Sequence, residues 1–175
     1  NTRGLIFLQA NKLDIAKWIF AEKVLRIDPN SVEALTNLGV VWIRLDDLPS
    51  AVALLKRAIK LDPSNIAARM NLGSIFIDYL NYNGAQEHYE YVLQAQPNNV
   101  EAVIGLATSQ LAKSDFKAGV DGYLRAYKLD PRRHELLLRT AKLYEDKFSK
   151  DEEGMKVAIG YYEQYATAAQ LPPAH

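Results

Sequence analysis

The sequence offers few residues that could carry out catalysis or hold a metal ion. Its three histidines, His88, His134 and His175, are scattered and have no second ligand at helical spacing, whereas a metal site needs several ligands that converge. The segment Glu87–Glu90 contains a histidine, but its side chains fall on different faces of one helix, as is typical of a solvated surface. No cysteine is present, which excludes disulfides, thiolate metal sites and cysteine nucleophiles. We therefore expect no metal site.

Motifs for phosphate binding and nucleophilic catalysis are also missing. Gly73-Ser74 and the segment Gly119–Gly122 lack the lysine and the strand, loop and helix context of a phosphate-binding loop. No Gly-x-Ser-x-Gly sequence occurs, and no spacing brings serine, histidine and acidic residues together. The sequence therefore predicts a non-catalytic protein without a cofactor.

Positive and negative side chains balance, with 21 lysines and arginines against 21 aspartates and glutamates. No net field would attract nucleic acid or an anionic membrane, so we expect protein or peptide partners and no nucleic acid. The longest apolar runs, such as Leu38–Ile43, are far shorter than the roughly 20 residues of a transmembrane helix. These features predict a soluble protein, cytoplasmic by default, while a periplasmic or envelope-associated location stays open. Because the chain begins at Asn1 without a signal-peptide pattern, we expect a fragment or processed form.

The strongest pattern in the chain is an internal repeat with a period of about 34 residues, a length typical of stacked repeats. Pro29, Pro63, Pro97 and Pro131 mark it at even spacing, and three of them follow an aspartate. Proline disfavours a helical turn before it and lacks an amide hydrogen, so each Asp-Pro pair is expected to end a helix. A fixed period predicts a stack of repeats in which each unit buries its apolar face against its neighbours.

Aligning the repeats on the proline, as position 32, gives three regular units at 32–65, 66–99 and 100–133 of one solenoid that spans 1–175. An irregular unit at 1–31 precedes them, and a last repeat at 134–169 and a tail at 170–175 follow. Small residues at positions 8 and 20 would let two antiparallel helices approach, and larger ones at 7, 11 and 24 would fill the space between hairpins. The recurring residues are Leu38, Leu72 and Leu106 (position 7); Gly39, Gly73, Ala107 and Ala141 (8); Trp42, Phe76, Gln110 and Tyr144 (11); Ala51, Ala85 and Gly119 (20); Leu55, Tyr89 and Tyr123 (24).

This pattern predicts ten helices of roughly 10–15 residues and no strands. Polar residues after the prolines are suited to cap the next helix, and short polar segments within each unit are suited to form turns. The expected caps are Ser31, Asn65 and Asn99, and the expected turns are Asp46-Asp47, Asn81–Gly84 and Ser114-Asp115.

One unit carries Leu38-Gly39, Trp42, Ala51, Ala58 and Leu61-Asp62-Pro63, and these residues resemble the tetratricopeptide repeat (TPR) family. The resemblance implies an all-α, right-handed superhelix of about five helix hairpins. It also implies a concave groove, lined by the first helix of each unit, that binds peptides or protein surfaces.

The two ends of the chain depart from the regular pattern. The interval from Ala16 to Pro29 is one residue longer than the corresponding interval from Ala51 to Pro63, and this first unit lacks a convincing Leu-Gly pair. We expect it to act as an end cap or to begin within a repeat. In the last unit Ala158 suits position 20 only if about five residues are inserted in the turn around Phe148–Gly154.

If the family geometry holds, one face of each first helix lines the groove. At its centre, six apolar residues would form a strip suited to an amphipathic helix or an extended apolar segment; the alternative is that some of them belong to the core. The predicted partner-binding residues are Asn37, Val40, Ile43, Arg44, Met70, Asn71, Ser74, Ile77, Ile104, Thr108, Leu111 and Arg139.

The resemblance also implies a clamp for a C-terminal carboxylate, which needs a lysine at position 2 and asparagines or arginine at position 6 of successive units. Asn37 and Asn71 match the asparagine positions. At position 2 this chain has Glu33, Ala67 and Glu101, and the glutamates would repel a carboxylate. Such a clamp is disfavoured, and Asn37 and Asn71 are better interpreted as polar residues typical of the family.

The sequence thus favours a non-catalytic scaffold or adaptor that organises a multiprotein complex. Two alternatives stay open. The chain could be a self-assembly module that associates through its end units, or an accessory region of a larger enzyme, because the fold alone does not decide function.

Overall fold

A computed structural model describes residues 2–170, and every regular element in that range is helical. The described part divides into two compact units, the first ending at Val92 and the second beginning at Leu93. The predicted tail, residues 170–175, lies outside the described residues except for the backbone of Gln170.

The first unit contains three helix pairs. Its helices are α1 (Thr2–Gln9), α2 (Leu13–Trp18) continued by the π-helical segment η1 (Ile19–Leu25), α3 (Val32–Arg44), α4 (Leu48–Leu61), α5 (Ile66–Asp78) and α6 (Tyr82–Ala95), whose last residues belong to the second unit.

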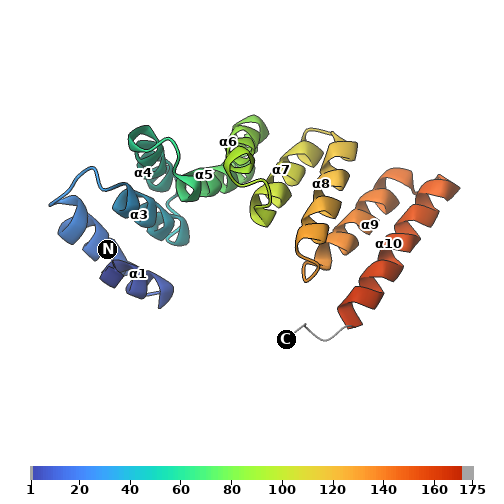
Figure 1. The fold of residues 1–175 in the computed structure, drawn as a ribbon, viewed down its shortest axis with the longest axis horizontal. Coiled ribbons are helices and arrows are strands. Elements are labelled where there is room, and N and C mark those ends of the chain that lie inside the picture. The colour runs from blue at the N-terminus through green and yellow to red at the C-terminus, as the bar shows by residue number, and fades with distance from the viewer. Residues whose placement is uncertain (1, 171–175) are drawn as a thin grey trace. The chain divides into compact units, whose positions relative to one another are not determined.

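The second unit contains two further pairs, which run side by side as hairpins (Figure 1). They are α7 (Val100–Ala112) with α8 (Phe116–Leu129), and α9 (Glu135–Phe148) with α10 (Glu152–Gln170). With α2 and η1 counted as one continuous helix, the described residues form ten helices and no strand, as predicted.

The turns inside the hairpins share one geometry. Asp46, Leu80 and Ser114 adopt left-handed backbone angles, with φ of 62°, 58° and 66°. The residue after each of them caps the second helix through a side-chain oxygen: Asp47 accepts from the Ser50 amide at 3.0 Å. Asn81 and Asp115 do the same at the equivalent positions of the next two hairpins. This repeated cap explains why the hairpins begin their second helices in register.

The middle turn is shorter than the predicted segment Asn81–Gly84. Helix α6 already begins at Tyr82, so Gly84 is helical and its amide is bound by the Asn81 side chain at 3.1 Å. A Cβ at Gly84 would lie 2.7 Å from the Phe76 ring. Gly84 therefore allows close packing against Phe76 and is not part of the turn. The sequence alone does not distinguish these two roles of a glycine.

Two of the three helix caps expected between successive repeats are confirmed. Asn65 accepts from the Ala68 amide at 2.8 Å and Asn99 from the Ala102 amide at 3.0 Å. Ser31 occupies the N-cap position of α3, but its side chain forms no capping hydrogen bond.

Close helix approach within the hairpins depends on small residues, as the columns predict: a Cβ at Gly119 (position 20) would lie 3.1 Å from the carbonyl oxygen of Ala107 (position 8). A Cβ at Gly73 would lie 2.8 Å from the Tyr89 ring, so position 8 also lies against position 24. Gly39 faces Leu55 in the same way. Each glycine makes room for the large side chain at position 24 of the second helix.

The irregular first hairpin contains one extra residue, and η1 accommodates it. The left-handed residue Asn11 lies one position farther from Pro29 than Asp46 lies from Pro63. A π-helix bonds each residue to the fifth along the chain and so takes up one more residue per turn than an α-helix. The shift identified from the sequence is therefore taken up within η1 (Ile19–Leu25).

Alignment before this shift locates the position-8 glycine of the first unit, which lacks a Leu-Gly pair as predicted. Counting back one repeat and the extra residue leads from Gly39 to Gly4 and from Leu55 to Phe20. A Cβ at Gly4 would lie 2.5 Å from the fully buried Phe20 ring. Gly4 thus occupies the position-8 site, with Arg3 in place of the leucine.

The last hairpin does not have five residues inserted in its turn. The α9–α10 turn, Ser149–Asp151, has three residues like the others, and Asp151 caps α10 by accepting from the Gly154 amide at 2.7 Å. The interval from Ala141 to Asp151 is two residues longer than that from Ala107 to Asp115, so the end of α9 takes up the extra residues. Ala158 is buried but stands seven residues after the cap, which matches Gly122 rather than position 20.

The carbonyl at each of the first three prolines of the repeat accepts a hydrogen bond from an arginine. Arg57 donates to the Pro29 carbonyl at 2.7 Å, and Arg125 donates to the Pro97 carbonyl across the same sequence separation. The corresponding residue of the middle unit is Tyr91. There the buried Arg69 stacks 3.5 Å from the Tyr91 ring and donates from Nε to the Pro63 carbonyl at 2.8 Å.

A pair of glycine substitutions tests the packing of the α7–α8 hairpin. A Cβ at Gly122 would lie 2.6 Å from the Cβ of Ala107, whereas a Cβ at Gly160 in α10 meets nothing within 4 Å. We expect Gly122→Ala to lower the free energy of unfolding by roughly 1–3 kcal/mol, because the helices must separate. Gly160→Ala should raise it by up to about 1 kcal/mol through helix propensity. Urea denaturation of both variants measures this, and equal effects would contradict the close approach.

Candidate protein-binding site

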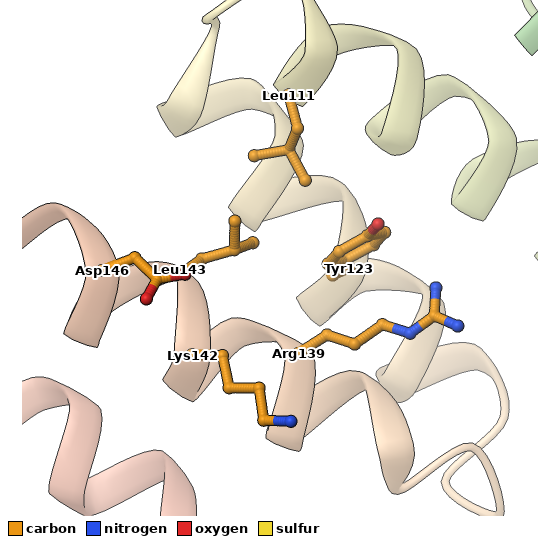
Figure 2. Close-up of a pocket in the computed structure, with 6 residues that line it drawn as sticks. All are labelled: Leu111, Tyr123, Arg139, Lys142, Leu143 and Asp146. Carbon is orange, nitrogen blue, oxygen red and sulfur yellow. The ribbon is translucent and has the colours of Figure 1, made fainter.

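An apolar hollow with charged edges lies in the second unit. It has a volume of about 220 Å³, and we call it the α7–α9 hollow. Its lining residues are Leu111 from α7, Tyr123 from α8, and Arg139, Lys142, Leu143 and Asp146 from α9 (Figure 2).

The apolar part of the hollow rests on the core of this unit. Leu111 and Leu143 are half-buried and pack against the cluster that contains Val103, Ala107 and Leu136. Leu111 also lies directly over Gly119, where a Cβ would overlap its side chain. The small residue at position 20 thus seats the leucine whose other side faces the hollow.

The tyrosine wall of the hollow is held in place by hydrogen bonds. The Thr108 hydroxyl donates to the Ile104 carbonyl at 2.9 Å, so the Tyr123 hydroxyl, 3.0 Å away, donates to the Thr108 oxygen. Tyr123 is only 5% exposed. A ring fixed in this way needs little reordering when a ligand side chain packs beside it.

The charged side chains occupy opposite ends of the hollow. Figure 2 shows Arg139 at one end and Asp146 at the other, with Leu143 between them. Within residues 2–170, the side chains of Arg139, Lys142 and Asp146 form no ion pair or hydrogen bond with one another or with other residues. The hollow can hold one large apolar side chain of a ligand. Its unpaired charges are then available to the ligand residues on either side of that side chain.

The structure places three of the four predicted residues of the second unit in or beside this hollow. Leu111 and Arg139 line it, and Thr108 contacts its tyrosine. Ile104 is half-buried and packs against the core cluster, as the alternative interpretation of the apolar strip anticipated.

The eight predicted residues of the first unit are not buried, but several have structural contacts. Val40 packs against the cluster around Phe20, and Ile43 packs against the cluster around Leu72. Arg44 donates from Nη1 to the Leu8 carbonyl at 2.8 Å. None of these contacts tests partner binding, so that role stays a prediction for all eight residues: Asn37, Val40, Ile43, Arg44, Met70, Asn71, Ser74 and Ile77.

The polar side chains of this set differ in how well they are satisfied. Asn71 donates to the Ala67 carbonyl of its own helix at 2.8 Å. The Nδ2 atom of Asn37 is buried and has no hydrogen-bond partner among the described residues. An unmet donor of this kind is costly to bury.

The sequence did not identify Tyr123 and Leu143 as site residues. Tyr123 had been assigned to packing between hairpins because it occupies position 24. Its hydroxyl was a usable signal, because a buried tyrosine needs a hydrogen-bond partner and is placed where a polar group is near. Leu143 lies outside every recurring column, so no pattern pointed to it.

Comparison with known proteins identifies the family. The tetratricopeptide repeat profile matches residues 1–66 and 70–134, which is more than half of the chain. The chain belongs to the tetratricopeptide repeat family. Membership supports a general role as a protein-interaction scaffold. No curated protein sequence matches the chain significantly.

Solved structures confirm the all-α TPR fold. MamA (41-end) from Desulfovibrio magneticus RS-1 superposes with a TM-score of 0.87 at 19% identity, over 99% of this chain and 94% of that one. The MamA RS-1 ArsTM double mutant gives 0.85 at 20% identity, over 97% and 92% of the two chains. MamA MSR-1 gives 0.75 at 24% identity, over 93% and 94%. At these identities the likeness concerns the fold alone.

A metal-binding cluster and a membrane-spanning segment are two features that the described helices lack. Across residues 2–170, no group of three or more histidine or acidic side chains is arranged to bind a metal ion. In the same range, no helix has the length and apolar character needed to cross a membrane.

His88, in the segment Glu87–Glu90, lies against Phe76 with ring centroids 5.4 Å apart. Its Nδ1 atom is buried and has no hydrogen-bond partner among the described residues. Burial lowers the pKa of His88 below its ordinary value of 6.5, and the nearby charges of Arg69 and Lys56 lower it further, while Glu87 acts in the opposite direction. The histidine is thus a packed, neutral side chain in the first unit.

This lowered pKa predicts an acid-sensitive contribution to stability. His88 binds a proton more readily in the unfolded chain than in the folded one. Its contribution to the free energy of unfolding is therefore fully present above pH 6.5, and it falls as the pH drops toward the lower pKa of the folded state. Unfolding free energies measured from roughly pH 7.5 to about 5.5 should fall more steeply for the parent than for His88→Gln. Parallel curves would contradict a partly buried His88 with a lowered pKa.

Proposed function

We propose that this TPR protein is a non-catalytic scaffold that binds a segment of a partner protein in the α7–α9 hollow. Through this contact and the first-helix faces of each unit, it would organise a multiprotein complex. The observation that carries the proposal is an apolar hollow, bordered by unpaired charges, that the described residues leave unfilled. The family's general role in protein interaction supports it.

The composition of the hollow resembles the energetic centre of a protein interface. Such centres combine aromatic, aliphatic and arginine side chains inside a polar rim. Here Leu111, Leu143 and Tyr123 supply the apolar surface, and Arg139 and Lys142 supply the rim. A volume of about 220 Å³ has room for one leucine or phenylalanine side chain. We infer that an amphipathic helix or extended segment inserts one such residue.

Replacing Leu111 by glutamate tests this site. The new carboxylate would enter the hollow and pair with Arg139 or Lys142, so it should block an apolar ligand side chain. Val157→Glu is the matched control, because Val157 is a 41% exposed aliphatic residue on α10 outside the hollow. In quantitative affinity capture, specific partners should be lost, by at least about tenfold, with Leu111→Glu and retained with Val157→Glu.

Circular dichroism and thermal melting establish whether both variants are folded. If Leu111→Glu is folded and captures the same proteins in the same amounts as the parent, the hollow is not the partner site.

Self-association is the second candidate function, and it rests on the first hairpin. There Ile6, Ile15 and Trp18 are 56%, 43% and 52% exposed, a concentration of apolar surface that monomers usually avoid. If a second copy covers it, mass measured by light scattering should rise with concentration, and Trp18→Glu should abolish the rise. Leu61→Glu, on α4, is the control. A constant monomer mass would count against this candidate.

A further inference from the structure

Several charged side chains of the second unit have partners within it. Arg133 forms an ion pair with Glu101, and its Nη1 atom lies 3.7 Å from Oε1 of Glu135. Lys147 lies 4.0 Å from the Phe116 ring. Lys156, on α10, pairs with Glu152 at 3.0 Å and with Glu153 at 2.9 Å.

By contrast, the charged side chains that line the hollow have no such partners within the part of the chain that the structure describes. Arg139 and Lys142 are exposed cations three residues apart, so they share a face of α9. Asp146 follows four residues after Lys142. Because no ion pair or hydrogen bond within residues 2–170 engages these side chains, they are available to a ligand.

We propose that the α7–α9 hollow recognises a segment that carries a carboxylate close to its apolar anchor residue, and that it binds this segment in one direction. The ligand carboxylate lies over Arg139 and Lys142, and the end of the ligand near Asp146 is neutral or basic. This inference rests on the proposed function and specifies the chemistry of the partner.

The order of charges along α9 sets the direction. From Arg139 to Asp146 the helix rises by about 10 Å, with positive charge at one end, negative at the other and leucine between (Figure 2). A ligand with the opposite order of charges gains attraction at both ends, and the reversed ligand meets repulsion at both. The apolar anchor fixes the position of the ligand, and the charges fix its orientation.

An acidic protein segment fits this surface better than a phosphate backbone does. The surface of the hollow is largely apolar, and Asp146 would repel one phosphate of any chain that contacted both cations. A single carboxylate beside an apolar side chain fits the two cations and the apolar surface, and it avoids repulsion by Asp146. Arginine is also suited to bind a carboxylate in a bidentate manner.

The experiment is a selection from a random dodecapeptide library displayed on phage, against the immobilised full chain. The parent should enrich peptides with a large apolar residue and an aspartate or glutamate within four positions of it. The double variant R139E/K142E should lose these peptides and enrich ones with lysine or arginine instead. The control K117E/K128E changes net charge equally on α8, outside the hollow, and should select the parental peptides.

The best peptide is then synthesised and its affinity measured by fluorescence anisotropy. R139E/K142E should weaken binding by at least about tenfold, whereas K117E/K128E should change it less than about twofold. Replacing the peptide's acidic residue by lysine should restore binding to R139E/K142E. Asp146→Lys should admit acidic residues on both sides of the anchor.

The outcomes separate this inference from the proposed function. Peptides that need Leu111 but are indifferent to R139E/K142E would overturn the carboxylate preference and leave the apolar site intact. If no peptide is enriched, or if enrichment does not depend on Leu111, both the inference and the proposed site are wrong.

Discussion

The close approach of two helices at small side chains is the constraint on which the hairpins depend. Where a glycine stands at position 8, its missing Cβ leaves the space that a large side chain at position 24 occupies, as Gly39 does for Leu55. The same contact recurs between Gly4 and the buried Phe20, although that hairpin contains a π-helical segment. One local contact therefore sets the spacing of the helix pair in regular and irregular hairpins alike.

The hollow arises from this packing scheme with few changes. Position 24 holds a leucine in the second hairpin and a tyrosine in the fourth, so the ring of Tyr123 fills the structural role and adds a hydroxyl. That hydroxyl reaches Thr108 on the neighbouring helix. Leu111 is seated on Gly119 and exposes its other side. A binding surface can thus form without disturbing the core, because the residues that build it are anchored by the same contacts that hold the hairpin together.

The sequence predicted the helices well because their signals are local and periodic. Proline, small-residue columns and capping side chains act within a few residues, so Asn65 and Asn99 could be assigned as caps before the structure was known. The π-helix and the two added residues of α9 could be seen only as changes in spacing, since where an extra residue is absorbed depends on three-dimensional packing. Leu143 was missed for a related reason. A hollow is defined by side chains from three helices, and their joint geometry has no sequence period.

The proline carbonyls show how this chain separates stability from recognition. In one repeat Arg57 donates to the proline carbonyl. In the next repeat Arg69, which lies on a different helix and stacks on Tyr91, makes the equivalent hydrogen bond. These proline carbonyls lie in the loops between successive hairpins, and the chain supplies each with an arginine donor by two different routes. Because such bonds and the small-residue columns hold the hairpins, and Arg139 and Lys142 form no ion pair or hydrogen bond within residues 2–170, we expect the fold not to need these two cations. Charges that have no structural partner are the ones a scaffold can use to select its ligand.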